Sequence, residues 1–232
     1  MTTDAAIAER LLALRARIPQ HVTLIAVSKL QPASAIRAAY AAGQRDFGEN
    51  YVQEWRGKAA ALADLVDLRW HLIGSLQANK AKYVASAVSL VHTVDNVKVA
   101  KELDRRAAAR ESGQHLGVDA RAVPGPQGTR LVQRVLVQVN VAREASKAGV
   151  LSESLAPLLA ELRAFPHLEV AGLMTIPPAT GDPRPHFRAL RALASLHQLR
   201  DLSMGMSGDF GSAIEEGATL VRVGTAIFGT RT

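Results

Sequence analysis

Eight short, mostly apolar segments alternate with helical segments along the 232 residues, and this alternation limits the possible folds most. Repeated strand–helix alternation predicts parallel strands with helical crossovers, and eight units fit a (β/α)₈ TIM barrel. A doubly wound open sheet is the alternative, but no Gly-x-Gly-x-x-Gly motif follows the first strand. The predicted strands are 22–27, 45–48, 70–73, 91–94, 134–140, 170–176, 202–206 and 220–223. The predicted helices cover 7–18, 32–43, 51–65, 79–85, a segment capped by Asp95, 152–164, 185–199 and 209–216.

The stretch 112–130 interrupts this alternation. It contains six glycine and proline residues and few apolar ones, which is typical of a flexible surface loop. The strand–helix pattern resumes after it. We therefore expect a single domain over residues 1–232.

Composition excludes several classes of protein. Apolar residues make up 48% and charged residues 21%, as in ordinary globular proteins. The chain has no cysteine, so disulfides, Cys-ligated zinc and thiolate catalysis are excluded, and we predict no metal site. Residues 1–4 lack the basic start and apolar core of a signal peptide. No uncharged apolar stretch approaches the ~20 residues of a membrane span. A cytoplasmic protein without membrane contact is expected.

The net charge of +7 raises the question of nucleic acid. Basic residues are scattered in short pieces on the predicted helices, and no Lys/Arg-rich tract has interleaved aromatic residues for base stacking. A solvated basic surface explains the charge, and we predict no nucleic-acid binding. The same field favours a small anionic ligand.

Lys29 lies at the end of the first predicted strand, after six apolar or β-branched residues. Lysine is seldom buried at such a place, because desolvation of an ammonium is costly. A dry environment would favour the neutral amine, which attacks an aldehyde to form a Schiff base. The alternative is a lysine whose side chain extends from the strand end into solvent.

Two later loops suit a phosphate. Ser207-Gly208 precedes a short helix, and Gly224-Thr225 follows the eighth predicted strand; barrels often bind phosphate after strands seven and eight. Alternatively, these glycines only turn the chain. Arg222 lies on the last strand and shares a face with Leu220 and Gly224. It requires a partner, either a carboxylate in a structural salt bridge or a ligand atom. An imine-forming lysine, a phosphate site and an arginine together describe a pyridoxal 5′-phosphate (PLP) site.

Longer motifs, spread in order over nearly the whole chain, make the prediction of a PLP site specific. They are Ala-Val-Ser-Lys (26–29), Phe-Gly-Glu-Asn-Tyr-Val-Gln-Glu (47–54), Trp-His-Leu-Ile-Gly (70–74), Leu-Gln-Ala-Asn-Lys (76–80), Ser-Lys-Ala-Gly (146–149), Gly-Leu-Met (172–174), Leu-Ser-Met-Gly-Met-Ser (202–207) and Val-Arg-Val-Gly-Thr-Ala-Ile-Phe-Gly (221–229). With them the chain resembles the pyridoxal-phosphate homeostasis protein family, single-domain relatives of the alanine racemase N-terminal barrel.

The resemblance implies a role for each site residue. Lys29 would hold PLP as an internal aldimine, while Ser207, Gly224 and Thr225 would bind its phosphate. Arg222 would face the pyridine nitrogen. Asn50 would lie near the ring hydroxyl, and Met206 would contact the ring through its backbone or by packing. His71 and Lys147 resemble residues at the rim of the site.

The resemblance also implies a function. An arginine at the pyridine nitrogen disfavours protonation of that atom and weakens the ring as an electron sink. Racemases of this type add a β-rich domain with a tyrosine base, whereas this chain stops at Thr232 with Tyr40, Tyr51 and Tyr83 on predicted helices. We therefore expect a monomeric PLP-binding protein without robust catalysis, active in vitamin B6 and amino-acid homeostasis, with PLP-dependent apo-enzymes as candidate partners. The alternatives are a weak amino-acid racemase and a barrel enzyme that forms an imine with a phosphorylated sugar.

Overall fold

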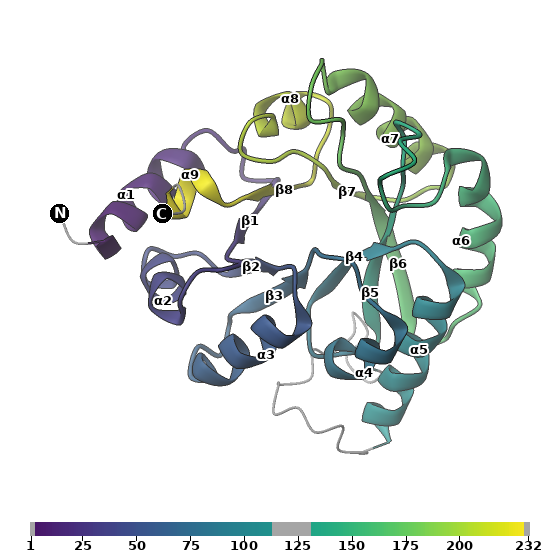
Figure 1. The fold of residues 1–232 in the computed structure, drawn as a ribbon, viewed down its shortest axis with the longest axis horizontal. Helices are drawn as coiled ribbons and strands as arrows, with labels where there is room; N and C mark the ends of the chain where they lie inside the picture. The colour runs from purple at the N-terminus through teal and green to yellow at the C-terminus, as the bar shows by residue number, and fades with distance from the viewer. Residues whose placement is uncertain (1–2, 113–130, 230–232) are drawn as a thin grey trace.

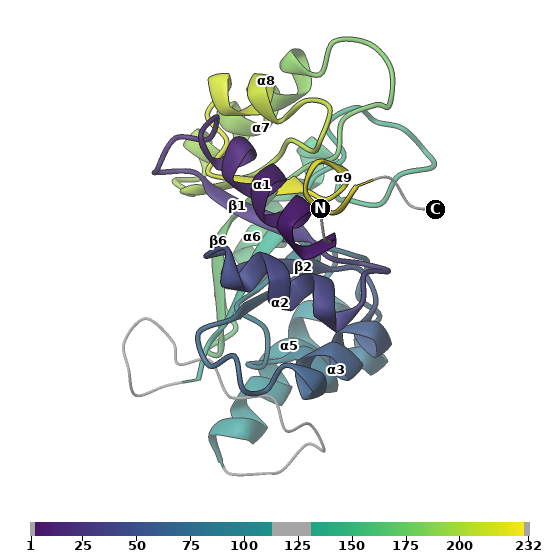
Figure 2. The same ribbon diagram turned by 90° about the vertical axis from the view of Figure 1, so that its left-hand side faces the viewer.

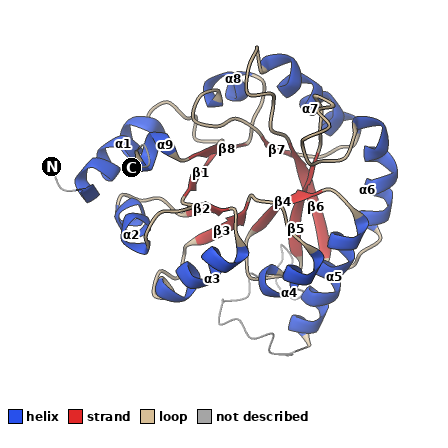
Figure 3. Cartoon of the chain, viewed as in Figure 1, coloured by secondary structure: helices blue, strands red, loops and turns tan. Residues whose placement is uncertain are grey.

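Parallel strands form a closed barrel surrounded by helices in the computed structural model, which describes residues 3–112 and 131–229 (Figures 1 and 3). Within these residues the eight strands follow one another around the barrel in chain order, and β8 pairs with β1 through Thr23↔Leu220 to Ala26↔Val223. The TIM-barrel prediction is therefore confirmed. The strands are β1 (Thr23–Val27), β2 (Asp46–Glu49), β3 (Arg69–Leu72), β4 (Leu90–Val94), β5 (Gln133–Gln138), β6 (Leu168–Met174), β7 (Asp201–Ser203) and β8 (Leu220–Val223).

Helices connect the strands on the outside of the barrel (Figure 1). They are α1 (Thr3–Arg15), α2 (Ala33–Ala41), α3 (Val52–Ala61), α4 (Ala81–Val84), α5 (Val97–Glu111), α6 (Leu155–Arg163), α7 (Arg184–Leu196), α8 (Phe210–Glu215) and α9 (Thr225–Phe228), with 3₁₀ turns at Ala78–Lys80 and Ser152–Ser154. Figure 2 shows α1 beside α9, where Arg10 Nε donates a hydrogen bond to Ile227 O at 2.7 Å. None of the described helices is long and apolar enough to span a bilayer.

Strand and helix bounds differ from the sequence predictions mainly at their ends. The predicted strand 202–206 ends at Ser203, because Gly205 adopts a left-handed φ of 89° and turns the chain. Asp95 was expected to cap α5, but the cap is Asn96, whose side chain accepts a hydrogen bond from Val99 N at 3.0 Å. The predicted loop 112–130 lies outside the described residues, apart from Ser112.

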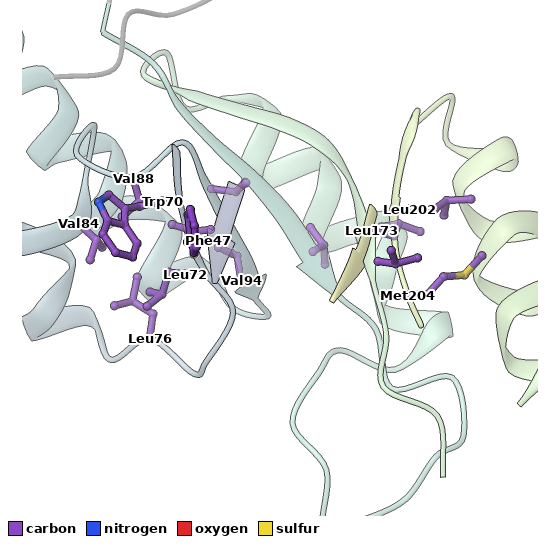
Figure 4. Close-up of a cluster of buried hydrophobic side chains, with 14 of the residues drawn as sticks. Phe47, Trp70, Leu72, Leu76, Val84, Val88, Val94, Leu173, Leu202 and Met204 are labelled. Atoms are coloured by element: carbon purple, nitrogen blue, oxygen red, sulfur yellow. The ribbon is translucent and has the colours of Figure 1, made fainter. Parts of the chain in front are cut away.

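The barrel has two apolar cores. The larger core fills the space between strands and helices, as the close-up of Phe47, Trp70, Val84 and Met204 illustrates (Figure 4). The smaller core lies inside the barrel and contains Ile25, Leu90, Leu136, Met174 and Leu220. Because side chains alternate along a strand, β1, β4, β5, β6 and β8 contribute to both cores. Polar side chains share the barrel interior with the smaller core, and they matter for the site.

Candidate functional site

The predicted site residues follow four neighbouring strands. Ser207 comes after β7, Thr225 after β8, Lys29 after β1 and Asn50 after β2, and these strands are consecutive around the closed barrel. Two of the strand ends meet closely, since a Cβ atom placed on Gly224 would lie 3.1 Å from the Val27 carbonyl oxygen. The structure therefore places the predicted residues at one end of the barrel, where barrels carry their sites.

Lys29 occupies a tight turn at the end of β1. Gln31 N donates to Ser28 O at 3.0 Å, and Leu30 has a φ of 62°, a conformation that costs a non-glycine residue free energy. The Lys29 side chain is partly exposed. The strand end is therefore less enclosed than the dry environment expected from the sequence, because Lys29 lies beyond the last strand residue, Val27.

A buried network of charged side chains stabilises this turn through hydrogen bonds. We call Ser28, Glu49, Glu54 and Lys58 the lysine cluster. Lys58 Nζ donates to Ser28 O at 2.6 Å, to Glu49 Oε1 at 2.8 Å and to Glu54 Oε1 at 2.7 Å. Ser28 Oγ donates to Glu49 Oε1 at 2.6 Å, and the backbone N–H of Leu30 donates to Glu54 Oε1. The residues on both sides of Lys29 are thus anchored to α3 and β2.

Charge balance stabilises the lysine cluster. Burial raises the pKa of Glu49, while hydrogen bonds from Lys58 and Ser28 lower it and leave a net increase. Glu49 is fully buried. Within the described residues, the second carboxylate oxygens of Glu49 and Glu54 have no hydrogen-bond partner. One ammonium group therefore supports two carboxylates, and its removal would leave buried negative charge uncompensated.

A close backbone approach places Asn50. A Cβ atom on Gly74 would lie 2.2 Å from Asn50 O and 2.7 Å from Asn50 Cα, so only glycine fits there. The loop after β3 is thereby pressed against the loop after β2. Asn50 is half-buried at this contact. The role implied for its side chain stays a prediction.

The turn after β7 presents Ser207 and constrains Met206. Met206 N donates to Asp209 Oδ1 at 2.5 Å, and Met206 O accepts from Phe210 N at 2.8 Å. Both backbone groups of Met206 are thus engaged in starting α8, which leaves its side chain, 38% exposed, for contact with a ligand. Gly205 is required here, because a Cβ atom would lie 2.5 Å from the Cβ of Ala213.

Unengaged backbone donors mark the predicted phosphate loops. Within the described residues, the N–H groups of Ser207, Gly208, Gly224 and Thr225 donate no hydrogen bond. Ser207 and Thr225 are exposed and also offer hydroxyl groups. Backbone N–H groups and hydroxyls on two neighbouring loops can together bind an anion.

Arg222 lies inside the barrel and is 4% exposed. Its guanidinium donates to Ser203 Oγ at 2.5 Å and to Thr175 O at 3.0 Å. No carboxylate of the described residues forms an ion pair with it, so the structural salt bridge considered from the sequence is absent there. Burial lowers the pKa of Arg222 to about 10, partly offset by Asp209, so the residue remains cationic at neutral pH.

The two predicted rim residues differ in position. Lys147 is partly exposed, donates to Pro177 O at 2.7 Å and pairs with Glu144 at 2.6 Å beside a cavity of about 370 Å³ lined by Ser75, Gln138 and Ile176 among others. His71 is not at the rim. It is 5% exposed and points into the barrel from β3, because its place in the strand alternates with the outward-facing Trp70 and Leu72.

Sequence reasoning missed the residues that support Lys29 and Arg222. Lys58 and Glu54 were counted as ordinary residues of the predicted helix 51–65, although their i,i+4 spacing is a signal of an ion pair. Ser203 and His92 stand within predicted strands, where polar residues among apolar neighbours signal an interior role. Tyr51 was expected within a helix but precedes α3 as its N-cap residue. No three metal-binding side chains converge in the part of the chain that the structure describes.

Comparison with known proteins gives consistent results. The profile of the family "Alanine racemase, N-terminal domain" matches residues 3–232. The pyridoxal phosphate homeostasis protein of Pseudomonas aeruginosa is 44% identical over 220 residues, which are 93% of this chain and 87% of that relative. Its counterpart in Aquifex aeolicus is 43% identical over 217 residues, covering 90% and 86%.

Solved structures match equally well. PipY of Synechococcus elongatus is known without PLP, at 41% identity and a TM-score of 0.83, and with PLP bound, at 40% identity and a TM-score of 0.82; each match covers 96% of this chain and 100% of PipY. Alanine racemase of Corynebacterium glutamicum is 21% identical with a TM-score of 0.65, covering 98% of this chain and 61% of the racemase. The racemase likeness concerns the fold alone.

Proposed function

The chain belongs to the pyridoxal phosphate homeostasis protein family, and on that premise we propose that it binds PLP and acts in intracellular PLP and amino-acid homeostasis. The solved PipY structure with PLP bound supports the choice of ligand. The observation that carries the proposal is the environment of Arg222: a buried cation at the site end of the barrel, held by a serine hydroxyl and a carbonyl oxygen rather than by a carboxylate.

The residues present fit this cofactor. Ser207, Gly224 and Thr225 offer unengaged backbone donors for the phosphate, and Arg222 offers an uncompensated positive charge for the pyridine nitrogen. Asn50 would lie near the ring hydroxyl, and the Met206 side chain would pack on the ring. When PLP is bound, its aldehyde carbon would form an imine with Lys29 Nζ, and the aldehyde oxygen would leave as water.

We propose that the protein holds PLP without robust catalysis. The cation of Arg222 disfavours a proton on the neighbouring pyridine nitrogen by like-charge repulsion, and the unprotonated ring is a poorer electron sink. The fold likeness to alanine racemase keeps a weak amino-acid racemase as the second candidate. Deuterium exchange at the α-carbon of alanine separates the two. Exchange at enzyme-like rates that disappears with Lys29→Ala would establish the racemase.

Absorption spectroscopy with peptide mapping tests the proposal. The wild-type protein is expected to take up PLP with a near-visible absorption band, and borohydride reduction is expected to fix a pyridoxyl group on Lys29. Lys29→Ala should lose the band and the fixed group, while the phosphate contacts retain some non-covalent PLP. Lys147→Ala is the matched control and should behave like the wild type. A wild-type protein that takes up no PLP would refute the function, and a fixed group at Lys147 would move the anchor.

The proposal extends to organisation and partners. We propose that residues 1–232 act as one monomeric domain and pass PLP to PLP-dependent apo-enzymes. A 24.8 kDa mass in solution and reactivation of such an apo-enzyme by the loaded protein are the expected results. Equal reactivation by free PLP at the same total concentration would argue against direct transfer.

A further inference from the structure

A continuous line of hydrogen bonds crosses the barrel interior and ends at Arg222. We call Ser203, His92, His71 and Asp46 the histidine chain. Arg222 Nη1 lies 2.5 Å from Ser203 Oγ, and Ser203 Oγ lies 2.8 Å from His92 Nδ1. His92 Nε2 lies 3.0 Å from His71 Nδ1, and His71 Nε2 lies 3.0 Å from Asp46 Oδ1. The chain joins β8, β7, β4, β3 and β2.

The two ends of the chain set the direction of its links when each imidazole carries one proton. Arg222 can only donate, so Ser203 Oγ accepts from it and has its own proton available for His92 Nδ1. His92 then carries its proton on Nε2 and donates to His71 Nδ1. His71 carries its proton on Nε2 and donates to Asp46, which can only accept. In this arrangement both imidazoles carry their proton on Nε2.

Electrostatics agrees with this assignment. Burial lowers the pKa of His92 well below its ordinary value, and the positive charge of Arg222 lowers it further. Burial alone would raise the pKa of Asp46, but hydrogen bonds from Arg69 and His71 outweigh burial and bring it to about 2. His92 is therefore neutral, and Asp46 is a fixed anion at the end of the chain far from Arg222.

That anion lies at the opposite end of the barrel from the site. Asp46 begins β2, and it accepts from Arg69 Nε at 2.8 Å and from Arg69 Nη2 at 2.6 Å. Together with Arg69 and His71 it lines a cavity of about 360 Å³ at the amino ends of the strands. A carboxylate in direct contact with Arg222 would neutralise its charge; a chain of neutral groups orients the guanidinium and leaves its charge available.

We propose that the histidine chain positions Arg222 for the pyridine nitrogen of PLP, with Asp46 fixing the direction of every proton in it. This inference rests on the proposed function, because it assigns Arg222 to the cofactor. Ser203, His92, His71 and Asp46 are positioning residues, since they act through Arg222. Cutting the chain leaves Thr175 O as the only oriented partner of the guanidinium among the described residues, so variants at different links should have the same effect on the cofactor.

Two substitutions that cut neighbouring links test the proposal. Ser203→Ala and His92→Leu are each expected to weaken PLP binding about three- to tenfold, the equivalent of one lost hydrogen bond, and to shift the absorption of bound PLP. The double variant should be no weaker than either single variant, because both cut the same chain. Losses that multiply would overturn the proposal, as would an unchanged affinity and spectrum in Ser203→Ala.

Conservative variants separate positioning from packing. His92→Asn keeps an acceptor where Nδ1 stood and should retain more PLP affinity than His92→Leu. Ile25→Val removes apolar volume from the same barrel interior without touching the chain, and its affinity should equal that of the wild type. Equal losses in His92→Asn and His92→Leu, or a matching loss in Ile25→Val, would show that packing alone matters.

Nitrogen-15 NMR of the protein without cofactor measures the tautomers of the two histidines in the histidine chain. The wild-type protein is expected to show His92 and His71 as Nε2–H tautomers at neutral pH, and Ser203→Ala should release His92 from this state. An Nδ1–H tautomer at either histidine of the wild type would refute the chain. A wild-type protein with the expected tautomers that takes up no PLP would refute the proposed function and the inference with it; unaltered PLP binding in the variants would refute the inference alone.

Discussion

The lysine cluster and the histidine chain support two residues of the candidate site, Lys29 and Arg222, with different chemistry. The lysine cluster lies between β2 and α3 and places Lys58 Nζ within 3 Å of the carboxylates of both Glu49 and Glu54. The histidine chain lies inside the barrel, where Ser203 and His92 are neutral and the charge of Asp46 is at the far end. One network is held by charge, the other by the placement of protons.

The difference follows from what each network supports. Lys29 must keep its backbone in a strained turn, and a buried ion network with several hydrogen bonds can hold a backbone if its charges are close to balance. Arg222 must keep its own charge available, so its partners have to be neutral. Buried charge is costly unless it is paired. The groups that orient Arg222 in the barrel interior are therefore neutral side chains with directed hydrogen bonds.

The largest effect is expected from a substitution that breaks the lysine cluster. Lys58→Met removes the only ammonium that supports Glu49 among the described residues. Breaking a buried ion pair from one side costs about 3–5 kcal/mol. The free energy of unfolding, measured by urea denaturation, should fall by about this amount, and PLP binding should weaken because the turn at Lys29 loosens.

A compensating double variant tests whether the loss of stability in Lys58→Met comes from charge. Glu49→Gln combined with Lys58→Met removes the uncompensated carboxylate, and the double variant should recover part of the lost stability. Equal stability of single and double variants would show that Lys58 acts through packing of its aliphatic stem and not through charge.

A smaller effect concerns pH and the histidine chain. The pKa of His92 in the folded protein lies well below 6.5, so below this pH the unfolded chain binds a proton that the folded protein does not. The contribution of His92 to stability is therefore complete above pH 6.5 and is lost as the pH falls, by up to about 1.4 kcal/mol per pH unit. Urea denaturation between pH 7 and pH 5 should show this slope, reduced by that amount in His92→Asn. Equal slopes would contradict a neutral His92.

The smallest effect is expected at the Asp46 end of the histidine chain. Arg69 is 54% exposed, so Arg69→Gln should cost only about 0–1 kcal/mol at neutral pH. The folded pKa of Asp46, about 2, lies below its ordinary value of 3.8, so its contribution to stability is complete above pH 3.8 and is lost as the pH falls toward 2. Arg69→Gln should raise this pKa and reduce the loss, which acid denaturation of the two proteins would reveal. If the loss of stability toward pH 2 were the same in the wild type and in Arg69→Gln, His71 alone would keep the pKa of Asp46 low.

Local pattern predicted much of the fold and part of the site. Strand–helix alternation identified all eight strands of the described barrel, with differences of at most three residues at their ends. Lys29, Ser207 and Gly224 were selected as candidates because strand ends are visible in a sequence, and the structure places them at one end of the barrel. Lys58 and His92 were missed, because their roles depend on partners 30 and 111 residues away, Ser28 and Ser203.

The sequence alone determined the barrel, the strand ends that carry the site and the resemblance to a PLP-binding family, since apolar periodicity and short motifs are local properties. Only the tertiary structure showed that His71 is interior rather than at the rim, that Arg222 has no carboxylate partner among the described residues, and that Lys58 supports two carboxylates. The reason is physical: burial, hydrogen-bond direction and charge compensation arise when closure of the barrel brings distant strands together.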